Sequence, residues 1–85
     1  PRLSLVDENM KAGIALAVTP GWPILTLHDK NGQRRIQLSV VAGGPALDLI
    51  YENDRPGIVL ALLPSAFAPH IHLYSRYGQL LWSAP

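Results

Sequence analysis

The sequence predicts an all-β domain made of three and a half antiparallel β-hairpin repeats, with seven or eight short strands. Three observations support this fold class: apolar and polar residues alternate on both sides of each turn, turn residues recur at a constant spacing, and no long segment has helical periodicity. Such strands make a sheet with one apolar and one polar face. We expect the sheet to form a small barrel, prism or sandwich, with a β-solenoid as the alternative.

Residues 23–40 are the clearest copy of the repeating unit. Leucines alternate with polar residues at 25–28, the turn sequence Asp-Lys-Asn-Gly follows at 29–32, and aliphatic residues alternate again from 36 to 40. An Asn-Gly pair between two alternating stretches is a strong short-range signal for a hairpin.

Prolines open each unit, at Pro1, Pro23, Pro45 and Pro69, with steps of 22, 22 and 24 residues. They divide a single domain, 1–85, into units 1–22, 23–44, 45–68 and a truncated 69–85. The predicted turns share aspartates that form Asx turns, asparagines that tolerate positive φ, and glycines that follow them. These turn residues are Asp7, Asn9, Asp29, Asn31, Gly32, Asn53 and Gly78.

The unit has the form L-x-L-x-D-x-x-G-x-x-R-x-x-L-x-V, matched by residues 25–40, and the chain closes on W-x-A-P at 82–85. In this pattern the chain resembles the repeats of uncharacterised bacterial proteins and, more loosely, the β-rich repeats of phage fibre proteins. The first unit has Met10 in place of the glycine, and the third has Tyr51 and Asp54 in place of the aspartate and glycine. The resemblance implies a repeat β-domain with homotrimeric assembly and carries no catalytic residue.

Composition indicates self-association. Charged residues are 15% of the chain and hydrophobic residues 48%, against about 25% charged in a typical domain. We therefore expect a homo-oligomer, a trimer or a dimer, with a further protein partner as an additional role. The net charge of +1 comes from scattered basic residues, which argues against nucleic-acid binding. The longest apolar run, at 58–63, is too short to insert into a membrane.

Histidines are the candidate metal ligands. His70 and His72 point to one face of a strand, and His28 lies on the corresponding face of its own strand. The three side chains would converge if those strands were neighbours. The alternative is that they are solvated residues of the polar face.

Aromatic residues near the connectors and the last hairpin are the candidate binding or interface residues. In these positions aromatics either stack on sugars and protein partners or fill barrel ends and subunit seams. The candidates are Trp22, Phe67, Tyr74, Tyr77 and Trp82.

Catalysis is not predicted, because the carboxylates form no pair with acid and base spacing and the serines lack a nucleophile motif. We expect no cofactor. The predicted function is a structural module that self-assembles or binds proteins. A small ligand- or carbohydrate-binding β-barrel is the alternative, and a metal site at the histidines is a third hypothesis.

Overall fold

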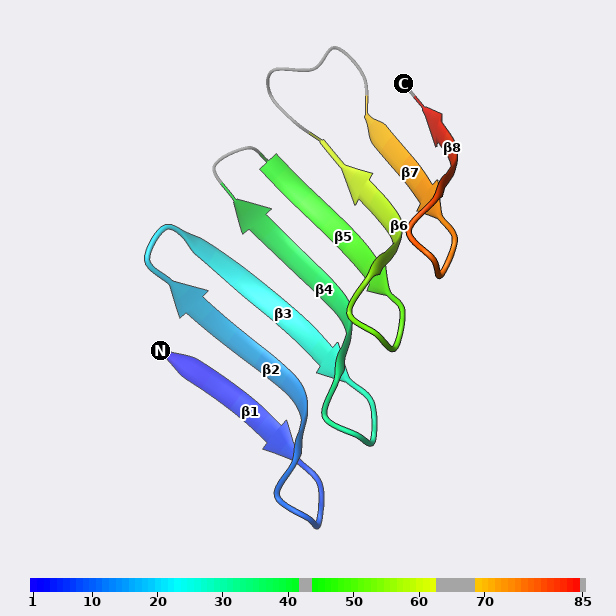
Figure 1. Cartoon of the computed structure of the whole chain (residues 1–85). Coiled ribbons are helices and arrows are strands. Elements are labelled where there is room, and N and C mark those ends of the chain that lie inside the picture. The colour runs from blue at the N-terminus through cyan, green and yellow to red at the C-terminus, as the bar shows by residue number, and fades with distance from the viewer. Residues whose placement is uncertain (42–43, 63–68, 85) are drawn as a thin grey trace.

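Eight antiparallel strands form one sheet in the computed structural model, which describes residues 1–41, 44–62 and 69–84 (Figure 1). Each strand pairs with the next one in sequence, so the strand order follows the chain order. The strands are β1 (Arg2–Val6), β2 (Ala12–Thr19), β3 (Trp22–His28), β4 (Arg34–Val41), β5 (Gly44–Ile50), β6 (Pro56–Ala61), β7 (His70–Tyr74) and β8 (Leu80–Ala84). The all-β hairpin-repeat prediction is confirmed, and the antiparallel order differs from a solenoid.

Two rows of apolar side chains cross the sheet at right angles to the strands, and together they define its apolar face. The first apolar row contains Leu3, Leu16, Leu25, Leu38, Leu47, Leu60, Ile71 and Ala84. The second apolar row contains Leu5, Ile14, Leu27, Ile36, Leu49, Ile58, Leu73 and Trp82.

Between these two rows, side chains that point the other way form the polar row on the opposite, polar face. Its members are Ser4, Ala15, Thr26, Gln37, Asp48, Val59, His72 and Ser83. The alternation of apolar and polar residues along each strand produces these two faces directly.

The sheet is open in the described part of the chain, with β1 and β8 at its edges. Barrel closure requires neighbouring strands to be staggered so that the register shifts around the barrel. Here the rows run straight from β1 to β8 without a net shift. The described strands therefore form an open sheet and do not show the expected closure into a barrel, prism or sandwich.

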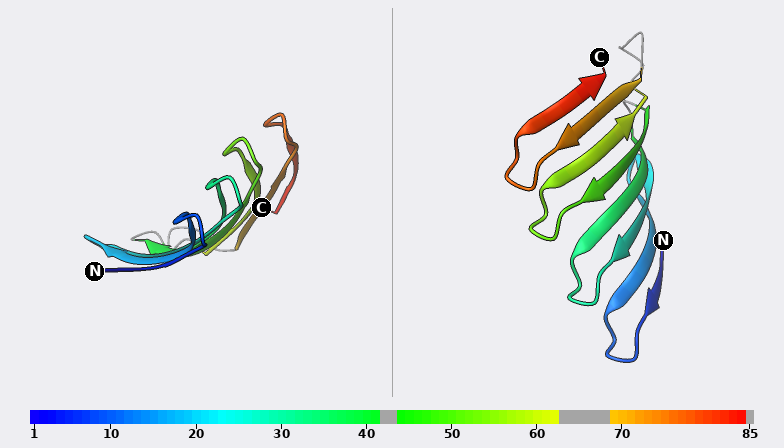
Figure 2. Two further views of the ribbon diagram at one scale, coloured as in Figure 1. Left: turned by 90° about the horizontal axis from the view of Figure 1, so that it is seen from below. Right: turned by 90° about the vertical axis from the view of Figure 1, so that its right-hand side faces the viewer.

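The molecule is a single twisted layer, and the hairpin turns bend out of the sheet plane to one side (Figure 2). Its extents are 43 × 30 × 13 Å, and its radius of gyration is 14.2 Å. A compact domain of this length has a radius of gyration of about 12 Å. Domains normally bury an apolar face between two layers, and residues 1–41, 44–62 and 69–84 form one layer only.

Four hairpin turns share one backbone design. The first begins with Asp7, whose N–H donates to the Lys11 carbonyl, while the Met10 N–H donates back to the Asp7 carbonyl. The second residue before the return strand takes positive φ in every case: Met10, Gly32, Asp54 and Gly78. Positive φ was expected at Gly32, where it occurs, and at the asparagines, each of which lies one residue before the position that takes it.

A β-bulge follows each turn, where the return strand carries one extra residue. The register skips Gly13, Arg35, Gly57 and Leu81, which stand opposite no single partner. The bulge was not predicted. The bulge residues of the first three hairpins, Gly13, Arg35 and Gly57, recur every 22 residues. This repeat spacing was the only sequence signal for the bulge.

The described residues include no helix that is long and apolar enough to cross a membrane.

Candidate functional site

The apolar face is a continuous surface of one chemical kind that crosses all eight described strands. Its two rows hold only apolar side chains, from one edge of the sheet to the other. Many of these side chains are exposed to solvent: Leu3 by 58%, Leu16 by 45% and Leu38 by 43%. A protein surface of this size normally carries charged residues, so this face has the composition of an interior.

The total exposed area agrees with this assignment. The chain exposes 6044 Å², whereas a folded monomer of its mass exposes about 5,000 Å². The most buried side chains, Ala15, Ser39 and Ile50, alternate with members of the apolar rows and so belong to the polar face. The aliphatic residues that would normally form the core are on the uncovered side.

A groove of about 500 Å³ lies on the apolar face, near the ends of the strands that carry the connectors. The first apolar row lines it from Leu25 to Ile71, together with the unit prolines Pro23, Pro45 and Pro69. The groove has an apolar lining and is open to solvent, so it suits an apolar side chain or surface more than a polar ligand.

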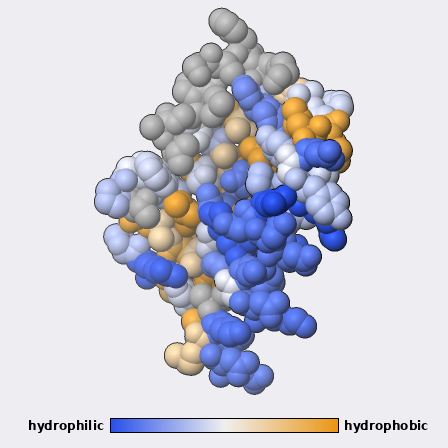
Figure 3. All heavy atoms as spheres, in the orientation of Figure 1, coloured by the Kyte–Doolittle hydropathy of each residue, from blue (hydrophilic) through white to orange (hydrophobic). Residues whose placement is uncertain are grey.

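The polar face carries the charged and hydrogen-bonding groups, and hydrophilic side chains cover much of the view in Figure 3. Arg34 is at its centre: Nη1 donates to Gln37 Oε1 (2.6 Å), and Nη2 pairs with Asp54 Oδ1 (3.1 Å). Burial raises the pKa of Asp48, and the positive charge of Arg34 opposes this effect. This arrangement links strands and turns and contains no pair of carboxylates.

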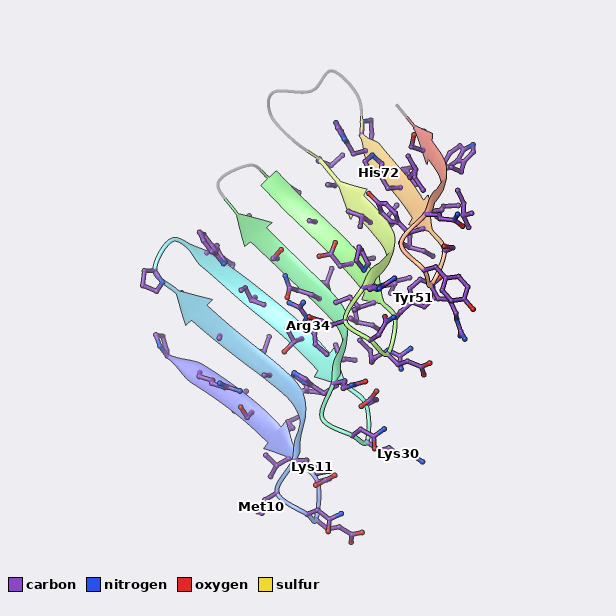
Figure 4. The ribbon with its side chains drawn as sticks, viewed as in Figure 1. Met10, Lys11, Lys30, Arg34, Tyr51 and His72 are labelled. Atoms are coloured by element: carbon purple, nitrogen blue, oxygen red, sulfur yellow. The ribbon has the colours of Figure 1, made fainter. Side chains whose placement is uncertain are left out.

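Side chains also join neighbouring hairpins (Figure 4). Arg35 Nε donates to the Ile50 carbonyl (2.7 Å), which connects the second hairpin to the third. The Tyr51 hydroxyl donates to the Tyr74 carbonyl (2.8 Å), which connects the third to the fourth. These two bonds link the turn ends of neighbouring hairpins to each other.

The predicted turn residues lie in the turns, where each aspartate side chain accepts hydrogen bonds from backbone N–H groups of its own turn. Asp7 Oδ1 accepts from the N–H of Asn9 and of Lys11, both at 2.9 Å. Asp29 does the same with the N–H of Asn31 (2.9 Å) and of Gln33 (3.1 Å).

The carboxylate of Asp29 responds to these contacts. The bond from the Gln33 N–H lowers the pKa of Asp29, and the bonds from Asn31 and Arg35 lower it further against the effect of desolvation. Asn53 Oδ1 accepts from the Arg55 N–H (3.2 Å).

Ser75 takes the place of the turn aspartate in the fourth hairpin, and sequence reasoning missed it. Its hydroxyl accepts from the N–H of Tyr77 and of Gln79, both at 3.2 Å. Its position at the start of the turn, aligned with Asp7 and Asp29, was the available signal.

The three histidines do not converge, so the predicted three-ligand arrangement is wrong. His28 is on β3 and the other two are on β7, with three strands between them. Strands are about 4.8 Å apart, so this separation is close to 20 Å. His70 and His72 have ring centroids 5.7 Å apart, and His72 Nδ1 lies 3.1 Å from the Tyr74 hydroxyl. No group of three metal-ligating side chains exists among the described residues.

The aromatic candidates are distributed over the molecule. Trp22 begins β3 at the connector end, whereas Tyr77 is in the turn at the opposite end of the last hairpin and is 77% exposed. Tyr74 ends β7, and Trp82 is on edge strand β8, in the second apolar row. Phe67 lies outside the described residues. The four described aromatics therefore form no common stacking platform.

Comparison with protein-family models, with curated proteins and with solved structures finds no match to this chain.

Proposed function

We propose that this chain is a structural, non-catalytic module that self-assembles by burying its apolar face against the apolar face of a second copy. The observation that carries the proposal is the composition of that face, which is apolar across all eight strands and uncovered. An uncovered face of this kind is unfavourable in water, because each fully buried aliphatic side chain contributes about 1.5–3 kcal/mol.

The available area is sufficient for a stable contact. The whole chain, turns included, spans 43 × 30 Å, a projected area of about 1,300 Å², and a typical stable interface buries about 800 Å² per partner. A second copy has the same composition, and pairing two such faces produces the two-layer arrangement that the fold lacks. The contact is isologous, so one surface patch serves both partners.

Neighbouring residues on β6 provide a matched test. Leu60 is in the first apolar row, whereas Val59 points to the polar face beside Asp48 and His72. Leu60→Lys places an unpaired charge in the proposed interface. We expect sedimentation equilibrium to show association of the unmodified chain, retention of it in Val59→Lys, and an association constant at least about tenfold lower in Leu60→Lys.

Circular dichroism of both variants establishes that they fold alike. An unmodified chain that sediments as a single 9.3 kDa species at micromolar concentration would contradict the proposal. Equal association of the two lysine variants would contradict it as well.

A second candidate function, binding of an apolar small molecule, has one observation in its favour. The groove on the apolar face has a volume of about 500 Å³, within the range of small-molecule sites. If it binds such molecules, a fluorescent apolar dye should bind to the chain with defined stoichiometry. Replacing Leu47, in the lining of the groove, by lysine should abolish that binding, and Val59→Lys should preserve it.

A further inference from the structure

The two edge strands are complementary to each other in direction. Strands alternate in direction along the meander, and there are eight of them, so β8 and β1 run in opposite senses. If a second copy continues the sheet beyond β8, its β1 meets β8 as an antiparallel neighbour. An odd number of strands would have produced a parallel seam.

The hydrogen-bonding groups of the two edges also match. The Val18 N–H donates to the Pro1 carbonyl, so by alternation Leu3 and Leu5 direct their backbone groups toward β2 and Ser4 directs its own outward. The Leu62 N–H donates to the Pro45 carbonyl. The same alternation, followed through β6 and β7, leaves the backbone groups of Ser83 facing outward on β8.

Side chains at the two edges continue the same rows. Ser4 and Ser83 belong to the polar row, Leu5 and Trp82 to the second apolar row. If Ser83 pairs with Ser4 of a second copy, Trp82 lies opposite Leu5 and each row passes from one copy to the next without a step. The junction between β8 of one copy and β1 of the next, called the seam below, then has the same pairing of polar-row residues as β2 and β3, where Ala15 pairs with Thr26.

Charges, prolines and bulges usually prevent strand addition at an edge. β8 carries one bulge, at Leu81 near its turn end, and pairs regularly with β7 from Trp82 to Ala84. Residues 80–84 contain no charge and no proline, and Leu80, Leu81 and Trp82 are 54%, 65% and 53% exposed. The only charge within β1 is Arg2. The middle of both edges is open to a pairing strand.

We propose that copies of this chain join edge to edge, with β8 of one copy hydrogen-bonded antiparallel to β1 of the next and Ser83 opposite Ser4. The contact is head to tail, so it leaves a free β1 at one end and a free β8 at the other, and the sheet can extend further. Edges and faces are separate surfaces, so this contact is independent of the face-to-face association proposed above.

Two proline variants test the seam, each blocking one edge. Ser4→Pro and Ser83→Pro remove an outward N–H and leave the backbone bonds within the chain in place, because edge strands tolerate proline at such positions. Ser4→Pro also removes the bond in which Arg2 Nε donates to Ser4 Oγ (3.0 Å), and Ser4→Ala removes it equally. In a Leu60→Lys background, which weakens the face contact, we expect each proline variant alone to sediment at 9.3 kDa. An equimolar mixture should form a species of twice that mass, from the free β8 of Ser4→Pro and the free β1 of Ser83→Pro.

Ser4→Ala and Ser83→Ala retain the N–H and are the matched controls, which should associate like their parent. Association of either proline variant by itself, no weaker than that of its alanine control, would show that the β8–β1 contact does not hold the copies together and would overturn the proposal. A mixture that stays at 9.3 kDa while both proline variants are folded by circular dichroism would also overturn it.

Amide hydrogen exchange on the unmodified chain tests the same seam without substitutions. We expect the Ser4 and Ser83 N–H groups to become protected as concentration rises. Free exchange of both at concentrations where the chain is associated would exclude the edge contact and leave the face contact unaffected. Failure of the face proposal is seen separately, as equal association of Leu60→Lys and Val59→Lys.

Discussion

The first and third hairpins have the same backbone and hold it by different means. In the first, Asp7 binds two N–H groups within its own turn, and Met10 at the positive-φ position is 79% exposed. In the third, Tyr51 replaces the aspartate and its hydroxyl reaches the Tyr74 carbonyl of the next hairpin. The first turn is stabilised by bonds within itself. The third has one such side-chain bond, from the Arg55 N–H to Asn53 Oδ1, and is also bonded to the next hairpin.

The bulge glycines show the same difference. A Cβ added to Gly13 would meet only the Leu5 carbonyl oxygen, at 3.8 Å. A Cβ added to Gly57 would lie 3.0 Å from the Leu49 carbonyl oxygen and 3.2 Å from the Tyr51 ring. Departures from the repeat in the third unit therefore belong together, because the tyrosine ring needs the space that a glycine leaves.

Alanine at these two glycines gives the largest expected difference between the hairpins. Gly57→Ala should lower the free energy of unfolding by about 1–3 kcal/mol, because the methyl group overlaps a backbone oxygen and an anchored ring. Gly13→Ala should leave it unchanged or raise it by up to about 1 kcal/mol, since alanine restricts the unfolded chain.

Urea unfolding followed by circular dichroism, at one fixed protein concentration, measures both values. The fixed concentration is necessary because association stabilises the folded chain. Equal effects of the two substitutions would show that the hairpins are equivalent and that Tyr51 does not occupy the space beside Gly57.

Removing the tyrosine hydroxyl should have a smaller effect. Tyr51→Phe keeps the ring beside Gly57 and deletes the bond to the Tyr74 carbonyl, so we expect a loss of about 1 kcal/mol. Tyr77→Phe is the control, because Tyr77 is 77% exposed in the last turn. Equal midpoints in urea for the two variants would indicate that the bond between the third and fourth hairpins does not contribute to stability.

The fold was predictable because its signals are local. Alternation with period two gives strands and faces, and the repeated turn residues give hairpins, so a meander follows without knowledge of distant contacts. Closure was not predictable in this way, because it depends on the accumulated register of all eight strands. The apolar face was predictable from the same alternation, whereas its lack of a covering layer appears only in the structure.

Contacts between hairpins were the least predictable part of the candidate sites. The bond from Tyr51 to Tyr74 spans 23 residues, and no local pattern marks it beyond the missing aspartate. Convergence of His28 with His70 and His72 was expected only if β3 and β7 were neighbours, and the strand order of the meander excludes that. The positive-φ prediction held at Gly32 and was one residue early at the asparagines, since Asn is common in that conformation and Met is not.

Glycine at the positive-φ positions of the two hairpins gives the smallest expected effects. Met10 has φ 64° and Asp54 has φ 65°, a conformation that is unfavourable for residues with a Cβ. Met10→Gly should relieve this strain and raise the free energy of unfolding by up to about 1 kcal/mol. Asp54→Gly relieves the same strain and loses the ion pair with Arg34, which at 40% and 72% side-chain exposure contributes less than about 1 kcal/mol.

The gain from Asp54→Gly should therefore be smaller than that from Met10→Gly in low salt. At about 1 M NaCl the ion pair is screened over roughly 3 Å, so the two gains should become nearly equal. Urea titrations of both variants and of the unmodified chain, at low and high salt, measure this convergence. A difference that persists at high salt would contradict this account. It would mean either that Asp54 stabilises the third turn through its hydrogen bond to Arg34 rather than through its charge, or that the two turns differ in backbone strain.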